Sequence, residues 1–77
     1  MKTTIKVERA KRDMTQQQLA DVLHVTRETI NSIEKIRFTP SVILALRISH
    51  YFELPVNELF ILDPEDFPTA VGKPGQR

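Results

Sequence analysis

Polar and basic side chains recur at helical spacing between residues 26 and 37 of this 77-residue sequence. Thr26 is a good helix N-cap, and the helix expected after it buries Ile30 and Ile33 on one face. The opposite face exposes the polar residues Arg27, Glu28, Asn31, Ser32 and Lys35. Arginine donates paired hydrogen bonds to a guanine edge, and a carboxylate can accept one from cytosine. The pattern is therefore typical of a helix that can enter the major groove of DNA.

A second helix must hold this one in place, and the sequence predicts it over residues 15–23. Thr15 and Gln18, three positions apart, form a capping box at its start. Ala20 is small enough to let the next helix cross closely, and only His24-Val25 remain for the connection. Two short helices joined by a turn of three or four residues form a helix-turn-helix.

The rest of the chain also reads as helical, because glycine is absent before Gly72. A first helix is expected over residues 4–12, with Ile5 inward and with Val7 and Ala10 as further inward residues. Pro55 begins a short last helix. The helix before it starts near residue 41 and has a wide apolar face formed by Val42, Leu44, Ala45, Leu46, Ile48, Ser49 and Phe52. The prediction is an all-α fold of five helices, with a domain over residues 1–62 and a mostly disordered Gly/Pro tail over residues 63–77.

Composition excludes several classes of protein. Without cysteine the chain has no disulfides and no thiolate metal site. No apolar run approaches the length of a membrane span, and charges near the N-terminus replace a signal peptide's apolar region, so we expect a cytoplasmic protein. His24 and His50 have no third ligand near them in sequence, and the serines have no His/Asp relay. We therefore expect no metal, no cofactor and no catalysis.

Charge is distributed unevenly, although the net charge is only +1. Residues 1–37 hold eight basic and five acidic side chains, which gives +3, and residues 38–77 hold three and five, which gives −2. One face is thus expected to meet a polyanion.

The stretch Thr15-Gln16-Gln17-Gln18-Leu19-Ala20…Val25-Thr26-Arg27…Thr29-Ile30…Ile33-Glu34-Lys35…Pro40-Ser41 resembles the phage Cro/cI-type, or Xre-like, repressor family. It is most similar to the small stand-alone prokaryotic regulators of that family. The resemblance covers roughly residues 5–60. It implies a five-helix lambda-repressor-like domain that binds operator DNA as a dimer and regulates transcription, with repression as the expected outcome.

The resemblance also implies roles for individual residues. The recognition positions, which contact bases, are Arg27, Glu28, Asn31 and Ser32. The phosphate contacts fall on Gln16, Thr26, Lys35, Arg37 and the loop around Phe38. Arg9 and Glu34 match a buried ion pair that ties the first helix to the recognition helix. From the residue types alone, Arg27 could equally meet a phosphate, and Glu28 could pair with Arg27 or face solvent.

Four positions depart from the family pattern. His24, Ile36 and Glu53 stand where the family commonly has glycine at the end of a helix, and Glu8 stands where an apolar residue is usual. A left-handed backbone is easier for His than for most residues other than Gly, Asn and Asp.

Apolar residues late in the chain exceed what a small core needs, and we expect them to form the seam of a homodimer. They are Ile43, Tyr51, Leu59, Phe60, Ile61 and Leu62. The tail beyond Asp63 is expected to be dispensable for pairing. Two other functions stay open: the antitoxin of a toxin–antitoxin pair, whose tail binds an unidentified protein partner, and an interaction module on the same fold that has lost DNA binding.

Overall fold

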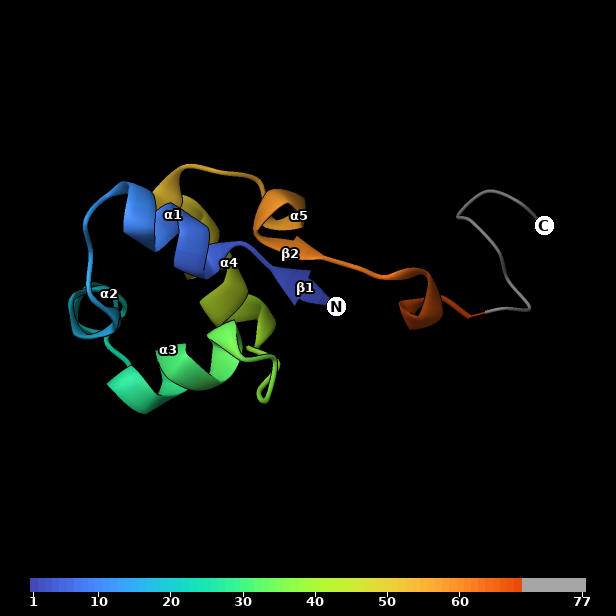
Figure 1. The fold of residues 1–77 in the computed structure, drawn as a ribbon, viewed down its shortest axis with the longest axis horizontal. Helices are drawn as coiled ribbons and strands as arrows, with labels where there is room; N and C mark the ends of the chain where they lie inside the picture. Colours follow the sequence, from blue (N-terminus) through green and yellow to red (C-terminus); the bar gives the residue numbers. More distant parts are fainter. Residues whose placement is uncertain (69–77) are drawn as a thin grey trace.

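The structure is a computed structural model that describes residues 1–68, and these form five helices and one small sheet (Figure 1). The helices are α1 (Ile5–Lys11), α2 (Gln16–Leu23), α3 (Arg27–Glu34), α4 (Val42–Phe52) and α5 (Val56–Leu59). The strands are β1 (Lys2–Thr3) and β2 (Phe60–Ile61), and one 3-10 turn, η1 (Pro64–Asp66), follows them. None of the helices in this part of the chain has the length and apolar character needed to cross a bilayer.

All five helices contribute to one apolar core. The buried residues are Ile5, Leu19, Ala20, Leu23, Ile30, Ile33, Leu44, Ile48, Phe52 and Leu59. In α4 the buried residues recur every four positions, so a single stripe of that helix faces the core. Ala20 is fully buried, and its small side chain lets α2 and α3 lie close together. The five-helix architecture predicted from the sequence is confirmed.

The two-stranded sheet was not predicted, because strands of two residues have no readable periodicity. β1 and β2 are antiparallel, with Lys2 opposite Ile61 and Thr3 opposite Phe60. Beside the sheet, the Thr3 hydroxyl donates a hydrogen bond of 2.8 Å to the Leu59 carbonyl. These contacts join β1 to the end of α5, where Leu59 is part of the core.

Polar side chains make many of the contacts between α1 and the rest of the molecule, whereas the sequence predicted that apolar side chains would make them. Val7 is 54% exposed and Ala10 is also exposed, so the prediction that they face inward was wrong. Inward positions on a helix recur at i, i+3 and i+4. Counted from the buried Ile5, these are Glu8 and Arg9, and both are half-buried. Val7 and Ala10 fall outside that stripe.

Glu8 supplies the contact that an apolar residue would otherwise make. Its carboxylate accepts hydrogen bonds from Arg12 Nη1 at 2.9 Å and from Lys11 Nζ at 3.2 Å. These bonds, chiefly that from Arg12, lower the pKa of Glu8. Arg12 in turn donates to the Phe52 carbonyl at 3.2 Å, and its guanidinium carbon lies 4.7 Å from the centre of the Phe52 ring. Glu8 therefore holds Arg12 over the end of α4.

Helices α1 to α4 each end at a left-handed residue that is not glycine. The backbone angle φ lies between 52° and 58° at all four of these residues, which are Asp13, His24, Ile36 and Glu53. After α3, the Ile36 amide donates to the Ile33 carbonyl at 3.0 Å and the Arg37 amide to the Ser32 carbonyl at 2.8 Å. This pair of bonds is the Schellman motif. The family commonly has glycine at this position, and Ile36 adopts the same helix-ending conformation. A left-handed backbone costs a β-branched residue about 1–3 kcal/mol.

The described part of the chain extends to residue 68, beyond residue 62 where the sequence predicts the end of the domain. Asp63 and Asp66 cap each other around η1, and both lie close to the Met1 amine, at 2.9 Å and 2.8 Å. Hydrogen bonds to Asp66 and Asp63 raise the pKa of that amine. These contacts connect residues 63–66 to the start of the chain, and the disordered tail over residues 63–77 stays a prediction. Residues 69–77 of the predicted tail lie outside the described residues.

Candidate nucleic-acid interface

The orientation of α3 is fixed by its cap and by two buried residues. The Thr26 hydroxyl accepts a hydrogen bond of 3.2 Å from the Thr29 amide and lies 2.9 Å from the Thr29 hydroxyl. Ile30 and Ile33 are each 1% exposed and hold one face of α3 on the core. The start and the outer face of α3 are therefore presented to solvent as a rigid unit.

The four predicted base-contacting residues lie on this outer face, in two different environments. Arg27 and Glu28, in the first turn, are exposed. Asn31 and Ser32, one turn later, are half-buried. Among residues 1–68, the ion pairs do not include one between Arg27 and Glu28. Within the described residues, the first turn of α3 thus carries a guanidinium and a carboxylate that form no ion pair.

Gln16, predicted to bind a phosphate, has protein partners in this structure. Its Nε2 atom lies 3.2 Å from Asn31 Oδ1 and 3.1 Å from Glu34 Oε1. The side chain of the first residue in α2 is therefore connected to the outer face of α3. Sequence reasoning did not anticipate this bridge, and its only signal is the position of a long amide side chain at the start of α2.

Arg9 and Glu34 form the ion pair that the resemblance implies. Arg9 Nε donates to Glu34 Oε2 at 2.9 Å, and Arg9 Nη2 donates to Glu34 Oε1 at 3.1 Å. The Glu34 side chain is only 4% exposed and that of Arg9 14%. The carboxylate raises the pKa of Arg9. Arg9 Nη1 also donates to the Met14 carbonyl at 2.7 Å, so the pair fastens α1 to both ends of the helix-turn-helix.

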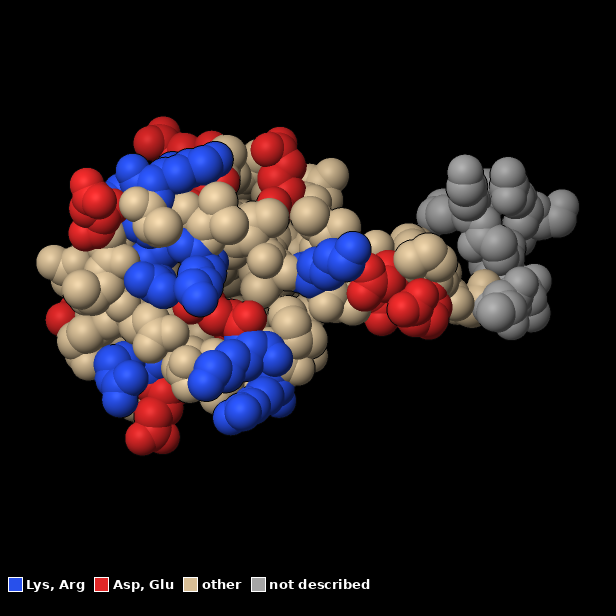
Figure 2. Space-filling view, viewed as in Figure 1, with Lys and Arg blue, Asp and Glu red and all other residues tan. Residues whose placement is uncertain are grey.

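Two cations that have no ion-pair partner among residues 1–68 follow the end of α3. Lys35 and Arg37 follow the helix and are exposed, and in the described part of the chain neither has a carboxylate at ion-pair distance. Phe38, beside them, is 47% exposed. Figure 2 shows basic side chains over α3 along the lower edge of the view, with an acidic one beside them, and further acidic side chains around η1 and along the upper and left edges. These cations lie next to α3, where the sequence predicts the contacts with a polyanion.

The predicted dimer residues separate into a core residue and a surface. Leu59 is 0% exposed and belongs to the apolar core of the monomer, so its assignment to a dimer seam was wrong. Phe60 is half-buried. The remaining four are exposed by 39–66%: Ile43, Tyr51, Ile61 and Leu62.

Two further apolar residues of α4 are also exposed, although the sequence predicted them to be part of the helix's apolar face. Val42 is 75% exposed and Leu46 is 55% exposed. The signal was available in the sequence: the apolar positions of α4 are too many for one helical stripe, so some must face outward.

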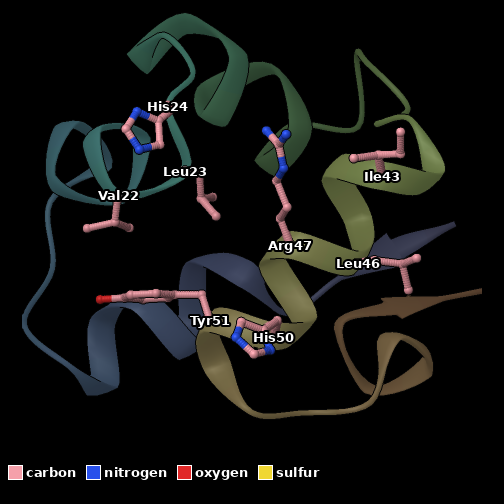
Figure 3. Close-up of a pocket in the computed structure, with 8 residues that line it drawn as sticks. All are labelled: Val22, Leu23, His24, Ile43, Leu46, Arg47, His50 and Tyr51. Carbon is pink, nitrogen blue, oxygen red and sulfur yellow. The ribbon is translucent and has the colours of Figure 1, made fainter.

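A groove of about 570 Å³ runs along this surface between the end of α2 and α4 (Figure 3). We call it the α2–α4 groove, and it is lined by Val22, Leu23, His24, Ile43, Leu46, Arg47, His50 and Tyr51. In Figure 3 the ring of Tyr51 faces Val22, and Arg47 extends from α4 toward α3. The lining is apolar apart from its basic side chains.

Comparison with known proteins supports the geometry. A family model described as "Helix-turn-helix" matches residues 5–59. An uncharacterized HTH-type transcriptional regulator of Archaeoglobus fulgidus is 44% identical over 66 residues, which cover 86% of this chain and 93% of that protein. The HTH-type regulator MJ0272 of Methanocaldococcus jannaschii is 38% identical, and YgzD of Bacillus subtilis is 36% identical; the matches cover 86% of this chain and 100% of each relative.

The matched region begins at Ile5 and ends at Leu59, both buried core residues, so it coincides with the folded helical body. It contains the capped α3, its exposed first turn and the neighbouring unpaired cations. The matched relatives are likewise named as transcriptional regulators. This chain belongs to the helix-turn-helix family of DNA-binding transcriptional regulators of the Cro/cI, or Xre-like, type.

Proposed function

We propose that this protein is a homodimeric, sequence-specific repressor that acts in the cytoplasm and reads operator DNA with α3. The observation that carries the proposal is the exposed first turn of α3, where Arg27 and Glu28 stand on a helix anchored by the buried Ile30 and Ile33. A helix held in this way can enter the major groove without losing its packing.

The proposal divides the face into base contacts and phosphate contacts. Arg27 and Glu28 are placed to meet base edges, with Asn31 and Ser32 at the inner margin of the contact. Phosphate contacts are assigned to Lys35 and Arg37, with further support from Gln16, Thr26 and the loop at Phe38. Phosphate contacts set affinity and orientation, and base contacts set sequence preference.

A second copy is proposed because one α3 spans too few base pairs to select a single operator. Two recognition helices can read successive major grooves when they lie about 34 Å apart. The exposed apolar surface of α4 and β2, which includes Ile43, Leu46, Tyr51 and Ile61, supports pairing there. This arrangement leaves both α3 faces free.

Selection of bound sequences from a random duplex pool tests the proposal directly. We expect a pseudo-palindromic motif whose half-sites are about 10 base pairs apart, and an affinity that falls steeply with salt. Binding that is absent at both low and moderate salt would instead favour the interaction module. A motif without symmetry, bound by one copy per site, would remove the homodimer but keep the DNA-binding role.

A further inference from the structure

The segment 62–67, which we call the arm, extends beyond the helices, and its Leu62 and Phe67 line a cavity shared with α5 and β2. In Figure 1 it leaves β2 and places η1 beyond the helices, at the end of the molecule opposite α2. Its two large apolar residues are only partly covered, since Leu62 is 52% exposed and Phe67 is 43% exposed. The Met1 amine fixes Asp63 and Asp66, so the arm has a defined shape. Glu65 carries a charge that has no ion-pair partner among residues 1–68.

The α2–α4 groove has the complementary properties. Its floor is apolar, and the charged and titratable lining residues are Arg47, His24, His50 and Tyr51, with no carboxylate among them. Arg47 also has no ion-pair partner in the described part of the chain. The groove therefore suits a short apolar segment that carries an acidic residue.

The arm cannot fill the groove of its own molecule. The groove opens beside α2, whereas the arm points away from the opposite end of the body (Figure 1). We propose that the arm of one copy lies in the α2–α4 groove of a second copy, with Leu62 and Phe67 on the apolar floor and Glu65 beside Arg47. The proposal rests on the homodimer proposed above and states how that dimer is built.

A twofold axis makes the exchange reciprocal, so each dimer contains two identical arm contacts. The contact covers apolar side chains that the monomer leaves exposed at both ends of the molecule. It also requires residues 62–67 for pairing, whereas the sequence had suggested that the chain beyond Asp63 is dispensable.

Engineered cysteines distinguish exchange between copies from contact within one copy. The natural chain has no cysteine, so each single variant carries one thiol. Pro68→Cys, directly after the arm, and His50→Cys in the groove are purified separately and mixed. They should give a disulfide-linked heterodimer that mass spectrometry identifies. The matched control mixes Pro68→Cys with Lys6→Cys on α1. We expect at least a fivefold excess of heterodimer in the first mixture.

A charge exchange tests the Glu65–Arg47 contact. Arg47→Glu and Glu65→Arg, each alone, should raise the dimer dissociation constant about threefold to tenfold, because each places like charges together. The double variant should return within about twofold of the natural protein. Lys6→Glu, also an exposed charge reversal, should change the constant by less than twofold. Melting temperatures verify that every variant is folded.

The outcomes separate this inference from the proposed function. Two results overturn the arm contact while the DNA-binding homodimer stands. In the first, the protein is a dimer but the Pro68→Cys and His50→Cys variants give no excess of the disulfide-linked heterodimer over the control. In the second, the dimer dissociation constant of the charge-exchanged double variant does not return toward that of the natural protein. A protein that sediments as a monomer at high micromolar concentration and binds DNA one copy per site overturns both the arm contact and the homodimer.

Discussion

Gln16 and Asn31 are joined by a hydrogen bond of 3.2 Å from the amide nitrogen of Gln16 to the side-chain oxygen of Asn31. The same Gln16 nitrogen lies 3.1 Å from Glu34 Oε1, and Glu34 binds Arg9 with both carboxylate oxygens. One chain of polar contacts therefore connects α1, α2 and the outer face of α3. In this structure the first residue of α2 orients the Asn31 side chain on the outer face of α3.

Gln16→Ala should reduce the free energy of unfolding by about 1 kcal/mol, because Asn31 and Glu34 each lose a hydrogen bond. It should also weaken the preference for the operator over random DNA, because Asn31 is no longer oriented. The control is Gln17→Ala, which removes an exposed hydrogen bond to Asp21 within α2. Urea unfolding and binding to matched duplexes measure both effects, and equal behaviour of the two variants would contradict the orienting role.

Glu34→Ala should reduce the free energy of unfolding by about 3–5 kcal/mol, since it leaves Arg9 largely buried without a counter-charge. A loss of this size unfolds much of the protein, because domains are stable by only about 5–15 kcal/mol. The double variant Arg9→Met/Glu34→Leu should recover most of the loss, because no unpaired charge remains. Circular dichroism during heating gives the comparison, and a melting temperature unchanged in Glu34→Ala would refute the structural importance of the pair.

Lys35→Ala and Arg37→Ala should weaken binding to all duplexes similarly and should lower the salt slope by about 1 for each lost phosphate contact. Arg27→Ala should instead change the preference at one base pair, by about 1–3 kcal/mol if it reads guanine. Lys6→Ala, on α1, is the control for the loss of an exposed positive charge. Fluorescence anisotropy against salt separates these cases, and a uniform loss in Arg27→Ala would reassign that residue to phosphate.

Ile36→Gly should increase the free energy of unfolding by about 1 kcal/mol. The left-handed backbone at φ 57° costs a β-branched residue about 1–3 kcal/mol. Glycine removes that strain but costs roughly 0.5–1 kcal/mol of chain entropy. Ile36 is 41% exposed, so little packing is lost. Ile36→Val keeps the branch and is the control, with a change near zero in urea unfolding. Destabilisation by glycine would mean that packing of Ile36 outweighs its strain.

Ile43→Asp should weaken self-association and operator binding together while the monomer stays folded, because Ile43 is 66% exposed. Leu59→Ala is the matched contrast: it should cost about 2–5 kcal/mol of monomer stability, since Leu59 is fully buried. Sedimentation equilibrium and thermal melting measure the two effects. An unchanged dimer in Ile43→Asp would place the pairing surface elsewhere.

The sequence by itself determined the helix-turn-helix and its local geometry. Thr15, Gln18 and Thr26 make the caps they were predicted to make, because a cap is formed by residues within three positions of each other. The Arg9–Glu34 ion pair could also be predicted, but only through resemblance to a family, because the two residues are 25 positions apart in the sequence.

Tertiary packing decided the rest. It buried Leu59 in the core, turned Val42 and Leu46 outward and connected Gln16 to Asn31. It also held Ile36 in a conformation that its own side chain disfavours. Helical periodicity shows that a helix has an apolar face, but when the apolar residues exceed one stripe, only the positions of neighbouring helices determine which of them are covered.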